Sequence, residues 1–522
     1  MELLLQVLFS SITLFILLLL AIYKFPFMTA NKKHLPPSPP GALPIIGHLR
    51  LLFTPLHRTL QAISTNSNQY AHYMLLKLGT RNLLVLSSPA AMEECFHKKD
   101  VALANRPRSI AADYNSYDYT AMGMANHGPL WRNLRRITAT EIFSSTSLQA
   151  SSSIRHDAVR CLLRDLYRMS TTSTSNNEGT TQNKIDLKLK FFELTFNVMM
   201  SMFTGEPIGD GLCHTEEYKW FFKLLRNAHV PHLFMAPGDY LPIFKYFDVF
   251  KVEKSLAAMS VERDAFFEEI IERCRKKYNG EKKSKSILDV FFSLQQADPE
   301  QYNDLIIKGM ILTMFTAGTD TSAMTLEWAM SLLLNHPETL QKAVDELNNN
   351  IIEPNRLLKD SDISNLPYIQ SIVQETLRLY PPVPFLLPHE VAQESKVDQY
   401  DVSSGTIVVA NVWAIHRDPK VWPEPDKFMP ERFMQSILQG ESKDGFKFVP
   451  FGIGRRGCPG GGLATRIIAL ALASVLWCFE WEKIGDEPID MSEEVQFLLP
   501  RAKPLVALCR PRSEMLNVMS QV

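Results

Sequence analysis

Four stretches of the chain space their apolar and polar residues regularly, and this spacing predicts their elements. Residues 70–90 alternate apolar and polar positions and are rich in β-forming residues, which predicts a small hairpin. Residues 304–335 and 366–380 follow the helical period, and each predicted helix ends within two residues of a proline. Residues 397–415 carry strand-like runs around a Ser-Gly turn. The pattern predicts a mainly α-helical fold with small β-sheets.

An apolar N-terminal segment precedes these elements. Residues 3–23 carry no charge and are about long enough to cross a bilayer as a helix. A cleaved signal peptide is the alternative, but the segment lacks a basic start and a clear small-residue cleavage site. Lys24, Lys32 and Lys33 follow it, which favours a cytosolic position for the body of the chain. We therefore predict a retained membrane anchor over residues 1–24.

A short connecting segment follows the anchor. Residues 25–47 are basic and rich in proline, and prolines at this density stiffen a linker into an extended form. No internal repeat is evident beyond it, and some large enzymes fold as one unit of this length. We expect a hinge over residues 25–47 and a single domain over residues 48–522.

The composition argues against several classes of function. The formal net charge of −1 lacks the basic excess that is typical of nucleic-acid binding. The seven cysteines are scattered and odd in number, which indicates a reducing compartment rather than a disulfide framework. The sequence has no CxxC or HExxH motif, no phosphate-binding loop and no obvious dinucleotide fingerprint. If the chain performs redox chemistry, its electrons are expected to arrive from another protein.

The predicted helix over residues 304–335, taken as one uninterrupted element, breaks a local rule in its middle. Glycine costs about 1 kcal/mol relative to alanine inside a helix, and Gly318 stands there beside an acid and four hydroxyl residues. A polar interruption of this kind indicates a functional site, with Asp320 and Thr321 as candidates. A solvent-facing polar patch is the alternative.

The loop over residues 450–460, PFGIGRRGCPG, places one cysteine among glycines and two arginines. The apolar residues 463–472 follow it and predict a buried helix. Free backbone N–H groups and the helix dipole are expected to lower the pKa of Cys458 and to favour its thiolate. A thiolate held this way suits an axial ligand of haem iron, whereas the alternative is a buried structural thiol.

Glu375 and Arg378 stand three residues apart on the predicted helix 366–380 and therefore share one face. Because this helix is apolar, the pair is expected to be buried, where it needs a further partner to be tolerated. Arg432 is the candidate partner. We expect these three residues to brace the fold rather than to react.

Taken together and in this order, the motifs resemble those of the cytochrome P-450 family of haem-thiolate monooxygenases. The cysteine loop matches the family pattern Phe-x-x-Gly-x-Arg-x-Cys-x-Gly, and the central helix matches Ala/Gly-Gly-x-Asp/Glu-Thr. Glu375-x-x-Arg378 and Arg432 match the family's Glu–Arg–Arg cluster, and Trp131-x-x-x-Arg135 matches the helix that holds a haem propionate. The resemblance covers essentially the whole chain and implies the cytochrome P-450 fold with an N-terminal transmembrane helix.

The resemblance also implies a cofactor and its contacts within the catalytic domain. The cofactor is haem b, with Cys458 as the iron ligand and with Asp320 and Thr321 delivering protons on the opposite face. Electrons come from NADPH indirectly, through a reductase partner. For His389 the alternative is an ordinary surface histidine. The residues expected to contact the haem or its propionates are Trp131, Arg135, His389, Phe451, Gly452, Arg456 and Gly460.

Within the family, the chain looks closest to plant microsomal enzymes of the isoflavone-hydroxylase-like group. The resemblance implies hydroxylation of a small hydrophobic specialised metabolite of the flavonoid or isoflavonoid, lignan, or terpenoid or triterpenoid class. The loop 114–124 is expected to help line the substrate pocket. The other expected pocket residues are Met314, Phe315, Val383, Leu387 and Phe497.

Other functions stay open at this point. The same fold supports an oxidative ring closure, or an isomerisation or dehydration, although the intact pair Asp320 and Thr321 argues against a reaction without O2. A non-enzymatic, membrane-anchored binding protein is the alternative of another class. The resemblance further implies a single-pass protein of the endoplasmic reticulum membrane, with its catalytic domain in the cytosol and no nucleic-acid partner.

Overall fold

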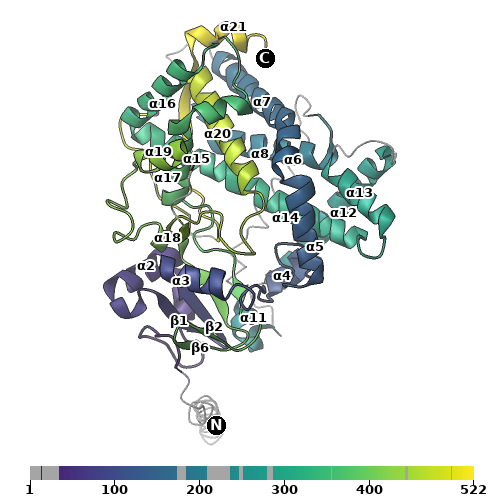
Figure 1. Cartoon of the computed structure of the whole chain (residues 1–522), viewed down its shortest axis with the longest axis vertical. Coiled ribbons are helices and arrows are strands. Elements are labelled where there is room, and N and C mark those ends of the chain that lie inside the picture. The colour runs from purple at the N-terminus through teal and green to yellow at the C-terminus, as the bar shows by residue number, and fades with distance from the viewer. Residues whose placement is uncertain are drawn as a thin grey trace, which may run out of the picture.

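Helices make up most of the described chain, and the small sheets include one at the end where the described chain begins (Figure 1). This computed structural model describes Thr13 and residues 34–172, 184–207, 236–245, 251–278, 286–353, 355–440, 445–494 and 497–522. The predicted anchor over residues 1–24 lies outside the described residues, apart from Thr13. The prediction of a mainly α-helical fold with small sheets is confirmed.

The helices follow one another with short connections. Their bounds are α2 (Leu56–Asn66), α3 (Pro89–Glu93), α4 (Ile110–Asn115), α5 (Pro129–Ile137), α6 (Ser145–Ala150), α7 (Ser152–Thr172), α8 (Leu187–Thr204), α11 (Pro237–Tyr240), α12 (Val252–Lys277), α13 (Ile287–Ala297), α14 (Asp304–Gly318), α15 (Asp320–Asn335), α16 (Pro337–Asn350), α17 (Pro367–Leu379), α18 (Val412–Ile415), α19 (Glu431–Gln439), α20 (Gly461–Cys478) and α21 (Leu516–Met519).

The strands form three small sheets, ordered β1-β2-β7-β4, β3-β9-β8 and β5-β6. Within the first sheet β2 and β7 run parallel, and the other pairs of the three sheets are antiparallel. The strand bounds are β1 (Tyr73–Leu78), β2 (Arg81–Leu86), β3 (Lys184–Asp186), β4 (His389–Glu390), β5 (Ser395–Val397), β6 (Tyr400–Val402), β7 (Ile407–Ala410), β8 (Phe479–Lys483) and β9 (Val506–Pro511).

The predicted hairpin is present as β1 and β2, which pair from Tyr73 with Leu86 to Leu78 with Arg81. Gly79 at its turn has φ +57° and lies against the backbone of Tyr240, so a side chain at this position would clash. The strand-like runs over 397–415 form no common hairpin, because β6 pairs with β5 and β7 joins the larger sheet. The end of that stretch is helix α18 rather than strand.

The central helix is not one uninterrupted element, as the sequence had predicted. Helix α14 ends at Gly318 and α15 begins at Asp320, with Thr319 between them at φ −86° and ψ −69°. The Thr321 hydroxyl donates to the Ala317 carbonyl at 2.5 Å, and this carbonyl is the one that the next turn of helix would use. A hydroxyl that competes for a backbone acceptor in this way bends or breaks a helix.

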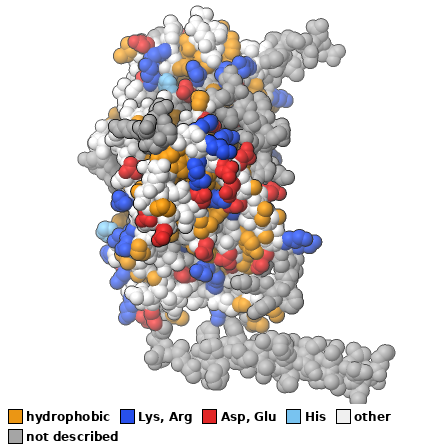
Figure 2. All heavy atoms as spheres, turned by 90° about the vertical axis from the view of Figure 1, so that its right-hand side faces the viewer, with side chains coloured by type: hydrophobic (Ala, Val, Ile, Leu, Met, Phe, Trp, Pro, Cys, Tyr) orange, Lys and Arg blue, Asp and Glu red, His pale blue; other side chains and the backbone are white. Residues whose placement is uncertain are grey.

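Helix α20 is buried in the main core, as predicted for the segment after Cys458, and it packs against α7, α15 and α17. In the part of the chain that the structure describes, it is also the one helix long and apolar enough to cross a membrane. Because 72% of that stretch is buried inside the protein, α20 is a core helix. The face formed by α12 and α13 carries acidic and basic side chains side by side (Figure 2), in keeping with the net charge of −1.

Candidate active site

The loop before α20 holds Cys458 in a fixed backbone conformation. The Cys458 N–H donates to the Phe451 carbonyl at 2.8 Å, and the Gly457 N–H donates to the Gly454 carbonyl at 3.1 Å. Gly454 has φ +72°, and a Cβ there would lie 2.5 Å from the Phe96 carbonyl oxygen. Only glycine fits this position without displacing the backbone. The loop therefore presents one cysteine from a backbone that is tied down on both sides.

Cys458 differs from the other described cysteines. It is exposed, whereas the five others in the described ranges are buried. The surrounding protein nevertheless removes enough water from the sulfur to raise the pKa of the thiol, while the Gly460 and Gly461 N–H groups and the Arg135 guanidinium lower it. The expected helix-end contributions are therefore present, but the expectation that they set the pKa is wrong, because burial outweighs them. A thiolate here needs a further positive partner, and a ligated metal ion supplies one.

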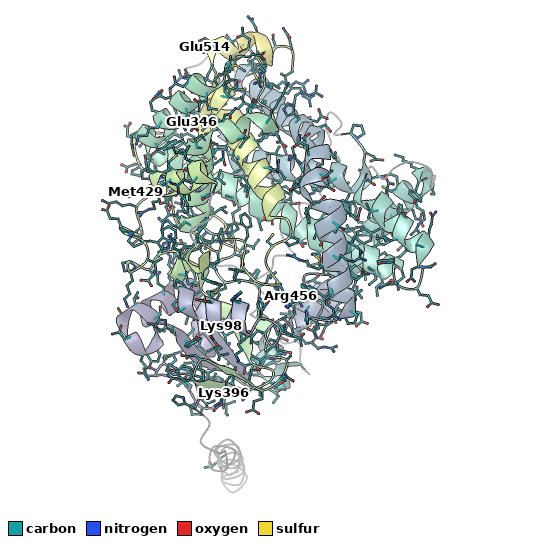
Figure 3. The ribbon with its side chains drawn as sticks, in the orientation of Figure 1. Lys98, Glu346, Lys396, Met429, Arg456 and Glu514 are labelled. Carbon is teal, nitrogen blue, oxygen red and sulfur yellow. The ribbon has the colours of Figure 1, made fainter. Side chains whose placement is uncertain are left out.

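Several cations converge beside this loop (Figure 3). Arg456 donates to the carbonyls of Ala104 at 2.8 Å and Ala125 at 2.5 Å, and its guanidinium lies 4.5 Å from the centre of the Trp131 ring. Burial and the nearby Arg135 lower the pKa of Arg456 to about 10. Burial likewise lowers the pKa of Arg135.

His389 and Arg106 complete this group of cations. His389 is 4% exposed, so the alternative of a surface histidine is wrong, and its Nδ1 donates to the Leu103 carbonyl at 2.7 Å. Burial, together with Arg106 and Arg456, holds the pKa of His389 well below its ordinary value. Arg106 is itself buried and donates to the carbonyls of Leu387 and Pro388. Sequence analysis missed Arg106, although its place between Asn105 and Pro107 was noted as part of the resemblance.

No carboxylate balances the guanidinium groups of Arg106, Arg135 and Arg456. Within the described ranges none of the three forms an ion pair, although Asp100 lies near enough to raise the pKa of Arg456. Buried cations that repel one another are costly without an anion. Together with the exposed Cys458, they fit a flat, dianionic, iron-bearing group such as haem, so the residues present suit this cofactor.

Another part of the site lies on α14 and α15. Ala317 is exposed and Thr321 half-buried, although most of the surrounding helix is buried. Residues four apart share a helix face, so Gly309, Thr313, Ala317 and Thr321 lie in one row. A Cβ on Gly309 would lie 3.0 Å from the Ala121 nitrogen, so the loop 114–124 lies across this row.

The predicted pocket residues on α14 are corrected by this arrangement. Phe315 is fully buried and stacks on Phe203 of α8, with ring centres 4.7 Å apart, and Met314 also belongs to the core. Both therefore lie in the core rather than in the row with Ala317. Thr313 and Thr316 are the less buried residues of α14, and their spacing from Thr321 was the signal that could have identified them.

The remaining expected pocket residues fall into two places. Val383 and Phe497 pack together with Met324, which lies one turn beyond Thr321 on α15. Leu387 instead lines a cavity beside Arg106 and the larger sheet. Gly318 also differs from expectation, because a Cβ there would lie 2.7 Å from the Met199 sulfur of α8. The glycine allows the two helices to approach each other.

Glu375, Arg378 and Arg432 form the expected cluster. Arg378 binds Glu375 through two hydrogen bonds of 2.6 and 2.8 Å, and both side chains are fully buried. The Arg432 Nε lies 3.3 Å from the same carboxylate, which also accepts the Met429 N–H at 2.9 Å. Arg378 and Arg432 donate their other N–H groups to backbone carbonyls of residues 416–427. The cluster thus holds the loop that precedes α19.

The sequence pattern of the cytochrome P450 family matches residues 36–508. The chain belongs to the cytochrome P450 family. It is 44% identical to cytochrome P450 81Q32 of Catharanthus roseus, over 97% of each chain. It is 39% identical to an isoflavone 2'-hydroxylase of Glycyrrhiza echinata, over 98% of this chain and 99% of that enzyme.

The fold agrees with this assignment. A zebra fish cytochrome P450 structure with progesterone superposes with a TM-score of 0.73, at 23% identity, over 88% of this chain and 100% of that one. This cytochrome P450 is a haem-dependent monooxygenase, which excludes the binding-protein alternative. Its substrate is small and hydrophobic, and a redox partner supplies its electrons.

Proposed function

We propose that this enzyme hydroxylates a plant flavonoid or isoflavonoid, with lignans and terpenoids or triterpenoids as the other candidate classes. Similarity to an isoflavone 2'-hydroxylase over nearly the whole chain supports the first class. The observation that carries the reaction type is the Thr321 hydroxyl, placed beside the exposed Ala317. NADPH would supply the electrons through a reductase.

Haem b supplies the activation of O2 when it is bound, and the chain positions it. Cys458 would ligate the iron, and Phe451, Gly452 and Gly460 would contact the porphyrin from the cysteine loop. Trp131, Arg135, Arg456 and His389 would hold the propionates, and the burial and charge of Arg106 add it to this set. Because His389 donates Nδ1–H to Leu103, its Nε2 must gain a proton before it can donate to a propionate. A bound anion would raise the pKa of His389 accordingly.

Asp320 and Thr321 would move protons toward the bound oxygen. The Thr321 hydroxyl donates to Ala317, so its oxygen keeps lone pairs that can accept a hydrogen bond from water. Asp320 is the first residue of α15, directly next to it. The acid and the alcohol together would pass protons from water to the reacting oxygen.

The pocket would favour an apolar substrate. Thr313 donates its hydroxyl to Gly309 and Thr316 donates to Leu312, at 2.9 and 2.7 Å, so both hydroxyl protons are used within α14. Methyl groups can then line the pocket together with Ala317. Val383, Phe497 and the loop 114–124 would complete it.

The same proposal places the enzyme on the endoplasmic reticulum membrane. Residues 1–24 would cross the bilayer once, and residues 25–47 would connect them to the catalytic domain over 48–522 in the cytosol. The uncharged segment 3–23 and the lysines after it support this topology. Protease protection of microsomes tests it, since the catalytic domain should be digested without detergent.

Turnover with reductase, NADPH and a panel of flavonoids, lignans and terpenoids tests the activity. We expect a product that has gained one oxygen atom and whose position is assigned by NMR. Loss of two hydrogen atoms would indicate ring closure instead, and a product of unchanged mass or one lacking water would indicate isomerisation or dehydration. Cys458→Ala is the control, since it should lose both the thiolate-type Soret band and turnover. Turnover that persists in this variant would contradict the proposal.

A further inference from the structure

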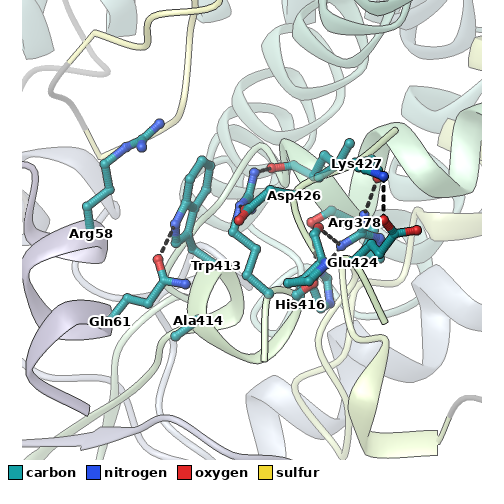
Figure 4. Close-up of polar contacts among 12 residues, drawn as sticks. Arg58, Gln61, Arg378, Trp413, Ala414, His416, Glu424, Asp426 and Lys427 are labelled. Atoms are coloured by element: carbon teal, nitrogen blue, oxygen red, sulfur yellow. Dashed lines mark hydrogen bonds and ion pairs between the residues drawn. The ribbon is translucent and has the colours of Figure 1, made fainter. Parts of the chain in front are cut away.

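His416 lies between the Glu375–Arg378–Arg432 cluster and the cysteine loop. It directly follows α18 and is fully buried (Figure 4). Its ring packs beside Phe448, with ring centres 5.4 Å apart. Sequence analysis attached no role to it beyond the resemblance of residues 414–418 to plant enzymes.

Both ring nitrogens of His416 bind backbone groups of different segments. The Val449 N–H donates to Nε2 at 3.0 Å, so Nε2 carries no proton. Nδ1 then carries the proton and donates to the Arg378 carbonyl at 3.2 Å. This arrangement defines one neutral tautomer, and it connects residues 378 and 449 through a single rigid ring.

The connection is reciprocal on the side of the cluster. The Arg378 guanidinium donates to the His416 carbonyl at 2.8 Å, while the His416 ring donates to the Arg378 carbonyl. The same guanidinium makes the paired hydrogen bonds to Glu375. His416 is therefore held by both its backbone and its side chain, which fixes the direction in which Nε2 points.

The connection continues into the cysteine loop on the other side. The Val449 carbonyl accepts the Gly452 N–H at 3.0 Å, and the Phe451 carbonyl accepts the Cys458 N–H at 2.8 Å. A short run of hydrogen bonds thus leads from Glu375 to the backbone of the cysteine. Val449 is 3% exposed, so water is not available to replace a lost partner of its N–H group.

We propose that His416 is a positioning residue that sets the register of the cysteine loop, and thereby the ligation of the haem iron by Cys458. It transmits the geometry of the buried cluster to residue 449. The role needs one acceptor and one donor at a fixed separation, and neutral histidine supplies both. The inference depends on the haem-thiolate chemistry of the family and not on the substrate.

His416→Phe tests the proposal, because phenylalanine keeps the ring packing and removes both hydrogen bonds. His48→Phe is the matched control, because buried His48 also bridges two backbone groups, accepting from Lys77 at 3.1 Å and lying 3.0 Å from the Pro39 carbonyl. His416→Gln is the rescue variant, because an amide offers one acceptor and one donor.

The measurement is the reduced carbon-monoxide difference spectrum of each haem-loaded variant in mild denaturant. We expect the thiolate-type band to convert to the neutral-thiol type about tenfold faster in His416→Phe, and His48→Phe and His416→Gln to stay within about threefold of wild type. Equal rates in His416→Phe and wild type would overturn the proposal, as would equal acceleration in His48→Phe. If His416→Phe binds no haem, the glutamine variant decides. A glutamine variant that retains the thiolate-type band at near the wild-type rate supports the relay, and fast conversion overturns it.

Discussion

At the scale of single residues, the Cys458 thiol shows how opposing effects combine. The N–H groups of Gly460 and Gly461 and the Arg135 cation favour the thiolate, but burial disfavours it more strongly. The thiolate character of this residue therefore depends on its partner, and the iron of haem supplies the required positive charge. The protein contributes placement and the metal contributes the ionisation.

Thr321 is the residue on which proton delivery is expected to depend. Thr321→Ala should retain haem but release more peroxide for each NADPH consumed, since the hydroxyl beside Ala317 is lost. Product formed per NADPH should fall about tenfold or more. Oxygen, NADPH, peroxide and product are measured together, and Thr321→Ser serves as the matched control. Unchanged coupling in the alanine variant would count against the proton-delivery role.

His416 is expected to make stability depend on pH. Burial, together with Arg378 and Arg417, lowers the pKa of His416 to about 3. The unfolded chain takes up this proton near pH 6.5 and the folded chain does not, so the contribution of His416 is present above about pH 6.5 and is lost as the pH falls toward 3. The fall in the free energy of unfolding between about pH 7 and 5, measured by denaturant titration, should be smaller in His416→Gln. An identical fall in both proteins would refute this expectation.

At the scale of elements, helix α14 shows how packing sets which face is functional. Phe315 and Gly318 face α8, whereas Thr313 and Ala317 face the loop 114–124 and the pocket side. Apolar character alone favoured Phe315 as a pocket residue. The contact with Phe203 of α8 assigns it to the core.

Gly318→Ala should destabilise the fold, even though alanine favours a helix by about 1 kcal/mol over glycine. The new Cβ would lie 2.7 Å from the sulfur of Met199, a side chain that is 2% exposed and has little room to move. Overpacking of this kind costs about 1–3 kcal/mol, so we expect a net loss of up to about 2 kcal/mol in the free energy of unfolding. Met199→Ala combined with Gly318→Ala should cost less than the sum of the single changes. A Gly318→Ala protein as stable as wild type would show that α8 yields.

At the scale of the whole molecule, the cofactor site joins segments from both ends of the chain. Arg106 and Trp131 come from the N-terminal part, and His389, Arg456 and Cys458 come from the C-terminal part. The guanidinium groups repel one another within this site, so the folded protein depends on an anionic cofactor for its stability.

Removal of haem should therefore lower the thermal unfolding midpoint. The loss should be larger at low ionic strength, because salt screens the repulsion among Arg106, Arg135 and Arg456. Circular dichroism melts of the haem-free and haem-loaded proteins at two salt concentrations measure both effects. In the haem-free protein, Arg135→Ala should reduce the salt dependence. A salt response that is the same with and without haem would contradict the account.

The sequence by itself determined the features that depend on short spacing. The cysteine loop, the Glu375–Arg378 pair, the hairpin at Gly79 and the buried helix after Cys458 all follow from residues close together in the chain, because local geometry places them. The family assignment rests on the same motifs and is confirmed by the match over residues 36–508.

Tertiary structure alone decided the features that depend on contacts between distant segments. The phase of α14, the break at Thr319, the place of Arg106 and the bridge through His416 each depend on packing or hydrogen bonds that periodicity does not encode. The physical reason is that a periodic pattern identifies apolar faces but not their neighbours. Burial against a particular partner then decides whether Phe315 fills the core or the pocket, and whether His416 is a spectator or a link.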